Sequence, residues 1–279
     1  MTTDAALGAA PRGHAPRPSL AATSAGDLPA PARGRIVAIA SGKGGVGKTW
    51  LAITLAQALA RAGRRVLLVD GDLGLANVDV QLGLDPPHDL GAVLAGRVGL
   101  AAAVLRHAAG GFDLLAGRSG SGALAGLDAV ALDRVLALLR EAAATGWQEV
   151  LVDLGAGLDA AQRRIAAAAD TLLVVATAEP TSLTDAYAVL KLHGRDRPGG
   201  GDARIVVNQA ADAASGRRTY EALRRAANAF LRRDVPLLGV VRRDARVPEA
   251  IRRRAPLLTR HPNSMAAADV ETLARALLS

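Results

Sequence analysis

Residues 42–49, GKGGVGKT, constrain the fold of this chain more than any other segment. They match the pattern G-x-x-x-x-G-K-[ST] and lie between an apolar run at 35–40, RIVAIA, and a segment with helical spacing at 50–63. A strand, a glycine-rich turn and a helix in this order are typical of a phosphate-binding loop. Glycines let the backbone wrap an anion, so that successive N–H groups and the helix N-terminus face its oxygens. The pattern therefore predicts a ligand that carries phosphates.

Strands and helices alternate along the rest of the chain. Short apolar runs predict strands at 35–40, 65–70, 112–117, 149–155, 171–177, 203–209 and 236–241. Helical spacing predicts helices at 50–63, 127–146, 160–170, 182–194, 217–233 and 263–278. Fully apolar strands that alternate with helices are typical of a mostly parallel sheet with helices on both faces. We expect one doubly wound α/β domain of the P-loop NTPase class over residues 35–279.

The N-terminal residues 1–34 have a different composition. They are mainly Ala, Pro, Gly, Ser and Arg, without hydrophobic periodicity. Such a segment buries too little apolar surface to offset the entropy of ordering it, so we expect a disordered leader.

Cysteine content and hydropathy exclude several classes of function. The chain has no cysteine, which excludes disulfides, thiolate metal sites and cysteine nucleophiles. No 18-residue stretch is free of charges and helix breakers, and no apolar signal core follows the start of the chain. We expect a cytoplasmic protein, and a peripheral contact with the inner membrane is left open.

Lys48 and Thr49 supply the chemistry of the loop. Only three of the 34 Lys and Arg residues are Lys, and two of these lie in the loop. Lys48 is a compact charge on a flexible stem that can follow the β- and γ-phosphates, where a planar guanidinium would be too bulky. The Thr49 hydroxyl is a ligand for Mg²⁺. The loop residues expected to bind the nucleotide are Gly42, Gly44, Gly45, Val46, Gly47, Lys48, Thr49 and Trp50.

The second lysine of the loop, Lys43, narrows the family. With it the loop reads K-G-G-x-G-K-[ST], which resembles the deviant Walker A loop of the MinD/ParA ATPases. In that family the lysine at this position reaches across a dimer interface to the partner's nucleotide. The resemblance implies that the chain forms a homodimer on binding ATP and that Lys43 stabilises charge there, together with Lys48. A lysine that only faces solvent is the alternative.

Carboxylates follow two of the predicted strands. Asp70 and Asp72 lie in LLVDGDLGL, and Asp153 lies in VLVDLGAG. A carboxylate at this end of a strand can order the waters of Mg²⁺ or orient an attacking water. The family's switch I implies the first role for Asp70 and the second, catalytic role for Asp72. Asp153 matches Walker B and would hold Mg²⁺ through a water, and Gly155 would offer its N–H to the γ-phosphate. Acids that cap strands by chance are the alternative.

Asn208 ends a later predicted strand, in IVVNQA. In the family an Asn at this place pairs with the adenine edge, since its amide offers both a donor and an acceptor. An Asn that only caps a helix is the alternative.

Two further stretches resemble the flagellar-number branch of the family, the FlhG or FleN ATPases. They are DGDLGLANVDVQLGL at 70–84 and EPTSLTDAYAVLK at 179–191, and the resemblance covers about residues 35–260. It implies an ATPase switch that hydrolyses ATP slowly and controls the number or placement of flagella. The FlhF GTPase and a flagellar transcription regulator are then the expected partners.

The chain departs from that branch in three places. Trp50 follows Thr49 where a small hydroxyl or amide residue is usual, so we expect a side-chain contact with the α-phosphate to be lost. The leader lacks the D-Q-A-x-x-L-R motif that stimulates the GTPase, and the chain ends in ETLARALLS without a basic, apolar helix for membranes. Stimulation of the GTPase and membrane targeting are therefore open.

Arginines gather in one part of the chain. Thirteen Arg and five acids lie between Arg204 and Arg254, so this segment carries the whole net charge of +8. In the helix predicted over 217–233, helical spacing places Tyr220, Leu223, Ala227, Phe230 and Leu231 on one face and Arg217, Arg218, Arg224, Arg225 and Arg232 on the other. The arginine face is either solvated or a surface for DNA, an anionic membrane or an acidic partner.

Two other functions stay open at this point. One is a ParA-type ATPase that partitions DNA or cargo, with the arginine face on DNA. The other is a nucleotide-gated adaptor with little turnover, in which Trp50 impairs hydrolysis.

Overall fold

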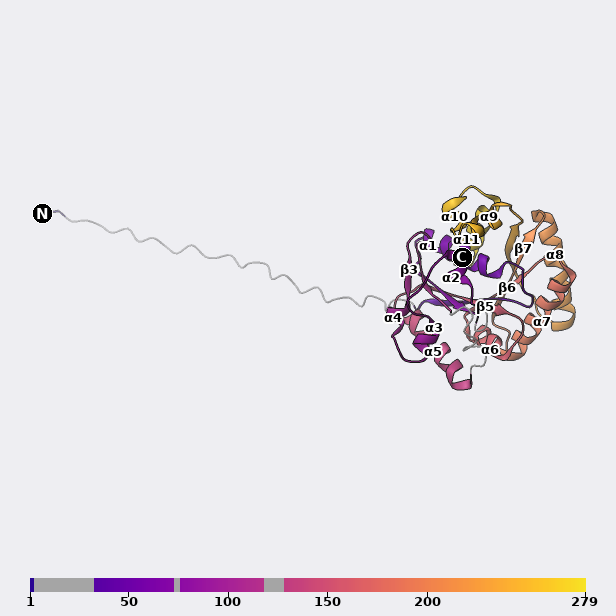
Figure 1. Ribbon diagram of the computed structural model, residues 1–279, viewed down its shortest axis with the longest axis horizontal. Helices are drawn as coiled ribbons and strands as arrows, with labels where there is room; N and C mark the ends of the chain where they lie inside the picture. Colours follow the sequence, from indigo (N-terminus) through magenta and orange to yellow (C-terminus); the bar gives the residue numbers. More distant parts are fainter. Residues whose placement is uncertain (3–32, 73–75, 118–127) are drawn as a thin grey trace. The chain divides into compact units, whose positions relative to one another are not determined.

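A sheet of eight strands forms the centre of the computed structural model, which describes residues 1–2, 33–72, 76–117 and 128–279 (Figure 1). The strands are β1 (Arg35–Ser41), β2 (Val66–Gly71), β3 (Leu105–His107), β4 (Phe112–Leu115), β5 (Glu149–Ala156), β6 (Thr171–Ala176), β7 (Asp202–Ala210) and β8 (Leu237–Arg242). Their order across the sheet is β3-β4-β2-β5-β1-β6-β7-β8. Every pair is parallel except β3–β4. The predicted mostly parallel sheet is confirmed.

Helices cover both faces of this sheet. They are α1 (Lys48–Arg61), α2 (Val78–Leu82), α3 (Leu90–Leu94), α4 (Leu100–Ala103), α5 (Ala129–Ala144), α6 (Ala160–Ala168), α7 (Pro180–Asp196), α8 (Ala213–Ala226), α9 (Arg246–Arg252), α10 (Leu257–Arg260) and α11 (Met265–Leu278). Successive side chains of a strand point to opposite faces. Accordingly Ile36 and Ala38 of β1 pack in one core with α5, α6, α7 and α8, and Val37 and Ile39 pack in the other with α1 and α11. The predicted doubly wound arrangement is confirmed.

The central position of β1 brings several strand ends together. It lies between β5 and β6, with β2 beyond β5 and β7 beyond β6. In open α/β sheets, ligands bind in the crevice beyond the carboxyl ends of the strands. The loop after β1 starts at that crevice, and Asp70, Asp153 and Asn208 lie at the carboxyl ends of their strands.

The end of α8 differs from the regular helix predicted over 217–233. Residues Ala227–Leu231 form a π-helix, η1, at the end of α8. A π turn holds more residues than an α turn, so it rotates the residues that follow relative to the α-helical spacing. Leu223 and Ala227 are buried, and Phe230 is 77% exposed although it lines the same hollow as Leu223.

The arginines of the face predicted on α8 differ in their contacts. Arg224 forms ion pairs with Glu221 and Asp234. The exposed arginines of the predicted helix 217–233 are Arg217, Arg218, Arg225 and Arg232.

Two expectations concern the ends of the chain and membranes. Residues 3–32 of the predicted leader lie outside the described residues. From Arg33 onward the chain joins the compact unit Arg33–Ser279, where the Arg33 guanidinium pairs with Asp170. No helix in the described ranges is both long and apolar enough to cross a bilayer.

Candidate functional site

The loop between β1 and α1 has the backbone geometry of an anion site. Gly45 and Gly47 have φ angles of 81° and 82°, in the left-handed region that glycine adopts without strain. Gly47 is also confined, because a Cβ on it would lie 2.7 Å from Nδ2 of Asn208. It caps the 14-residue helix α1 without a side-chain hydrogen bond. The positive end of the α1 dipole therefore lies in the loop, free of a competing side chain.

Lys48 is buried at this helix end and forms an ion pair with Asp153. Its Nζ lies 2.7 Å from Oδ1 of Asp153, and the two side chains are 8% and 1% exposed. Burial raises the pKa of Asp153, and the Lys48 charge and a hydrogen bond from the Thr49 hydroxyl oppose that rise. Three of the predicted site residues, from two segments about a hundred positions apart, thus meet around one carboxylate.

Asp70 adds a second buried carboxylate beside the first. It is the register partner of Asp153 across β2 and β5, and it is 1% exposed. It accepts hydrogen bonds from the backbone N–H groups of Asp72, Asn77 and Val78 at 3.2, 2.9 and 2.9 Å. Burial is the largest cause that raises the pKa of Asp70 to about 7, and the nearby Asp153 adds to it. A bound cation would favour the ionised form of both carboxylates.

The oxygen ligands offered by Asp70, Asp153 and Thr49 fit Mg²⁺ in particular. In the described part of the chain no three His, Asp or Glu side chains group closely enough to hold a metal ion by themselves. Mg²⁺ is bound through few protein ligands and keeps several waters and phosphate oxygens. Two carboxylates and the Thr49 hydroxyl next to a phosphate loop have this composition.

Asp72 lies against the carboxyl end of β5. An ideal Cβ on Gly155 would be 3.1 Å from Oδ1 of Asp72 and 2.6 Å from Nε2 of Gln162. The negative charge of Asp72 also contributes to the raised pKa of Asp153. The Asp72 carboxylate therefore lies close to the backbone of Gly155, and a side chain there would have to displace Gln162 and crowd Asp72. Gln162 of α6 was not anticipated, because nothing in the spacing of α6 links it to β5.

Asn208 ties the end of β7 to the loop. Its side chain is 2% exposed, and its Nδ2 donates to the carbonyl of Val46 at 2.8 Å. The adjacent Gln209 has a left-handed φ of 56° and donates from Nε2 to the carbonyl of Gly45 at 3.1 Å. Asn208 retains one N–H and one lone pair for a further partner. Gln209 was not anticipated, because its strained backbone carries no mark in the sequence.

A cavity of about 520 Å³ opens next to these residues. Its volume lies within the range of small-molecule sites, about 300–1,000 Å³. It is lined by Gly45, Gly47, Trp50, Asn208, Gln209, Arg242, Arg243, Asp244, Ala245, Val247, Pro248 and Ile251. The phosphate loop thus lines part of the cavity, and α9 with the segment before it lines another part.

Lys43 is the one predicted charge that the structure places elsewhere. Its Nζ lies 2.6 Å from Oε2 of Glu179 and 3.0 Å from Oγ1 of Thr181, at the start of α7. This contact lowers the pKa of the Glu179 carboxyl. The side chain of Lys43 is 40% exposed. In the single chain it therefore points to the surface rather than toward Lys48.

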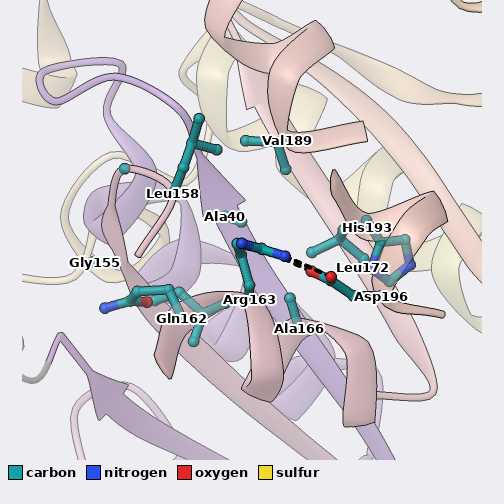
Figure 2. Close-up of a pocket in the computed structure, with 12 residues that line it drawn as sticks. Ala40, Gly155, Leu158, Gln162, Arg163, Ala166, Leu172, Val189, His193 and Asp196 are labelled. Atoms are coloured by element: carbon teal, nitrogen blue, oxygen red, sulfur yellow. Dashed lines mark hydrogen bonds and ion pairs between the residues drawn. The ribbon is translucent and has the colours of Figure 1, made fainter. Parts of the chain in front are cut away.

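A second, small cavity lies behind the segment after β5 (Figure 2). Its volume is about 20 Å³, which is room for about one water. Figure 2 shows Leu158 above it and the ion pair between Arg163 of α6 and Asp196 of α7 across it, with Nη2 and Oδ1 2.5 Å apart. Burial is the main cause that lowers the pKa of its neighbour His193 to about 4. This cavity is far too small for a nucleotide, and it belongs to the packing of α6 against α7.

Comparisons with known proteins agree with this geometry. Residues 37–257 match the model of the CobQ/CobB/MinD/ParA nucleotide binding domain. The antiactivator FleN of Pseudomonas aeruginosa is 35% identical over 241 residues, which cover 86% of this chain and 85% of FleN. The flagellum site-determining protein YlxH of Helicobacter pylori is 30% identical over 247 residues, which cover 88% of this chain and 82% of YlxH.

A solved structure shows the same fold with a ligand. The septum site-determining protein MinD of Pyrococcus horikoshii, in complex with Mg-ADP, superposes with a TM-score of 0.72. It is 27% identical, and the match covers 87% of this chain and 95% of that one.

Proposed function

Because the chain belongs to the CobQ/CobB/MinD/ParA nucleotide-binding family, we propose that it is an ATP-dependent switch that regulates the number or placement of flagella. It dimerises around two molecules of Mg·ATP and hydrolyses them slowly. The likeness to FleN and YlxH, over more than four fifths of the chain, supports the flagellar role. The dimer and the slow turnover are inferences from the site and from the family resemblance of its loop.

The observation that carries the proposal is the convergence of Lys48, Thr49 and Asp153 at the uncapped end of α1. Phosphates are held by the N–H groups of the loop and by Lys48. When they bind, Lys48 exchanges its partner Asp153 for a phosphate oxygen, so the lysine stays paired and the carboxylate becomes available. Exchange of one partner for another avoids leaving a buried charge unpaired, which would be strongly unfavourable.

The carboxylates and the hydroxyl would then hold the metal. Thr49 would bind Mg²⁺, and Asp70 and Asp153 would hold it through waters. The metal would supply positive charge beside the phosphates. Asp70 would then stay ionised, which burial alone disfavours.

Asp72 is the residue that acts on the attacking water. It lies beside Gly155, whose N–H would meet the γ-phosphate, so a water between the two groups would lie next to the reacting phosphorus. Asp72 orients this water by accepting a hydrogen bond from it. Asn208 pairs with the adenine edge through the part of its amide that the loop leaves open.

Lys43 makes hydrolysis depend on the dimer. At the protein surface it is held by Glu179 and Thr181, and in the dimer it leaves them for the partner's phosphates. A cation added at the moment of assembly stabilises the charge that develops in the transition state. Partners such as the FlhF GTPase or a flagellar transcription regulator would then recognise the dimer.

The function is tested by two measurements on the same variants. Purified protein should release phosphate from Mg·ATP, and deletion of the gene should change the number or position of flagella per cell. Restoration of the flagellar pattern by the wild type but not by Lys48→Ala is the expected result. A deletion strain with an unchanged flagellar pattern contradicts the flagellar role, and a protein without Mg·ATP turnover contradicts the enzymatic one.

A second candidate function rests on the exposed arginines Arg217, Arg218, Arg225 and Arg232. These residues could hold DNA phosphates, as expected of an ATPase that partitions DNA or cargo. In that case ATP-dependent binding to nonspecific duplex DNA should weaken steeply with salt and be lost in Arg218→Ala/Arg225→Ala. Absence of DNA binding at low salt would remove this candidate.

A further inference from the structure

Trp50 occupies an unusual place for the largest side chain of the chain. It is the third residue of α1, it lines the cavity of about 520 Å³, and only 6% of its surface is exposed. Val247, Pro248 and Ile251 of α9 line the same cavity. The indole therefore forms part of an apolar wall next to the glycines of the phosphate loop.

The indole N–H of Trp50 is unsatisfied within the chain. Nε1 is buried and has no hydrogen-bond partner among the residues that the structure describes. Trp147, the other tryptophan, donates from Nε1 to Oδ2 of Asp113 at 2.8 Å. Buried tryptophans usually find such a partner, and an unpaired buried donor is destabilising. Stability of the single chain alone therefore does not account for a tryptophan at this position.

The residues that line the cavity differ in character. Gly45 and Gly47 belong to the phosphate loop at the positive end of α1. Trp50, Val247, Pro248 and Ile251 offer mainly carbon surface, and the polar lining residues are Asn208, Gln209, Arg242, Arg243 and Asp244. A flat heteroaromatic base and its sugar match an apolar wall with a few polar groups beside it. A bare polyphosphate can use the glycines and the arginines but gains nothing from the apolar side chains.

We propose that Trp50 is a nucleoside contact: its indole ring is the wall against which the sugar and base of the bound nucleotide pack. The proposal rests on the proposed function, since it concerns the same nucleotide. The ring makes affinity depend on the nucleoside and not only on the phosphates. Trp50 thus adds a binding contact at a place where the sequence alone suggested a lost one.

The emission of Trp50 gives a direct test. In Trp147→Phe, Trp50 is the remaining tryptophan, because the chain has two. Trp147 lies two residues before β5, at the end of the strands opposite the phosphate loop, so we expect its replacement to leave the site intact. Mg·ADP and Mg·ATP should change the intensity or wavelength of this emission, and Mg·tripolyphosphate should not.

Binding measurements on two variants complete the test. By calorimetry, Trp50→Leu should bind Mg·ATP about tenfold more weakly, and Trp50→Phe, which keeps an aromatic wall, within about threefold of the wild type. Tripolyphosphate affinity should be unchanged in both, and Trp147→Leu serves as the matched control. Because Trp50→Leu could unfold, the Trp147→Phe emission and Trp50→Phe remain informative on their own.

The possible failures are distinguishable. Wild-type protein that binds no Mg·ATP overturns the proposed function and the inference together. Wild-type protein that binds Mg·ATP without any change in Trp50 emission overturns the inference alone. An equal response to tripolyphosphate, or unchanged ATP affinity in Trp50→Leu, does the same.

Discussion

Nζ of Lys48 lies 2.7 Å from Oδ1 of Asp153, and both side chains are almost wholly buried. The pair joins the phosphate loop to the end of β5, and Asp70 lies beside it on β2. Such a pair satisfies two buried charges in the free chain. When the pair opens, Lys48 can bind a phosphate and Asp153 can bind a metal, so each buried charge still has a partner of opposite sign.

Replacement of Lys48 should abolish nucleotide binding. In Lys48→Ala the phosphates lose their main fixed charge, and Asp153 is left buried without its cation. We expect no detectable binding of Mg·ATP by calorimetry and a free energy of unfolding lower by about 3 kcal/mol, the low end for a broken buried pair. Lys191→Ala, at an exposed position of α7, is the matched control. Unchanged Mg·ATP affinity in Lys48→Ala would remove the basis of the proposed site.

Asp72 should separate binding from hydrolysis. If it orients the attacking water, Asp72→Ala should bind Mg·ATP and release phosphate more slowly by roughly 10²-fold or more, the usual range for loss of a general base. The variant should then accumulate as an ATP-bound dimer on size-exclusion chromatography. Asp133→Ala, at an exposed position of α5, controls for the loss of a carboxylate. Wild-type turnover in Asp72→Ala would take this residue out of the mechanism.

Lys43 should act only in the dimer. Lys43→Ala should bind Mg·ATP nearly as well as the wild type, since Lys48 and the loop amides are untouched, and yet remain a monomer. Lys43→Arg keeps the charge but replaces the compact ammonium with a planar guanidinium, so we expect this variant to fail to dimerise as well. Wild-type dimerisation and turnover in Lys43→Arg would show that the position accepts any cation.

Glu179 should restrain Lys43 in the single chain. Its carboxylate binds Lys43 in the single chain, so Glu179→Gln should release the ammonium and lower the ATP concentration needed for dimerisation. Because the pair is exposed, we expect a modest effect, about twofold to fivefold. Sedimentation of Glu179→Gln over a series of ATP concentrations measures it. An unchanged or higher ATP requirement would argue against this holding role.

His193 should give the folded chain a pH-dependent stability. Its pKa is lowered from 6.5 to about 4, chiefly by burial and also by Arg233 and Arg197, while Asp196 acts in the opposite direction. Between these values the unfolded chain binds a proton that the folded chain does not, so the contribution of His193 to stability rises with pH from about 4 to 6.5 and is constant above. The free energy of unfolding of wild type minus that of His193→Leu should follow this rise. A difference independent of pH would contradict the lowered pKa, and His88→Leu serves as control.

The fold was largely predictable because its strands are short apolar runs and its loop pattern is specific. All seven predicted strands are present within one residue of their expected ends, apart from the strand predicted at 112–117, which ends two residues earlier. The edge strand β3 was not predicted, because its three residues, Leu105–His107, are too few to show a period. The π-helix Ala227–Leu231 was not predicted, since a π turn cannot be read from an α-helical spacing.

The candidate site was predictable in its residues but less so in its contacts. Glycines, lysines and strand-terminal acids carry their chemistry in their identity, so Lys48, Asp70 and Asp153 could be named from the sequence. The contact of Gln209 with the loop depends on one left-handed backbone angle, which the sequence does not reveal. The Lys43–Glu179 pair joins positions 136 residues apart, and only the packing of α7 beside β1 brings them together.

The mass of the protein in solution with different nucleotides tests the central claim most directly. Light scattering after size exclusion should give 28.4 kDa without nucleotide and with Mg·ADP, and twice that mass with Mg·ATP, most completely for Asp72→Ala. The ATP-dependent doubling should be absent in Lys43→Ala, which still binds Mg·ATP. A mass of one chain for Asp72→Ala in saturating Mg·ATP, under conditions where calorimetry shows the nucleotide bound, would contradict the account of this protein as a dimerising switch.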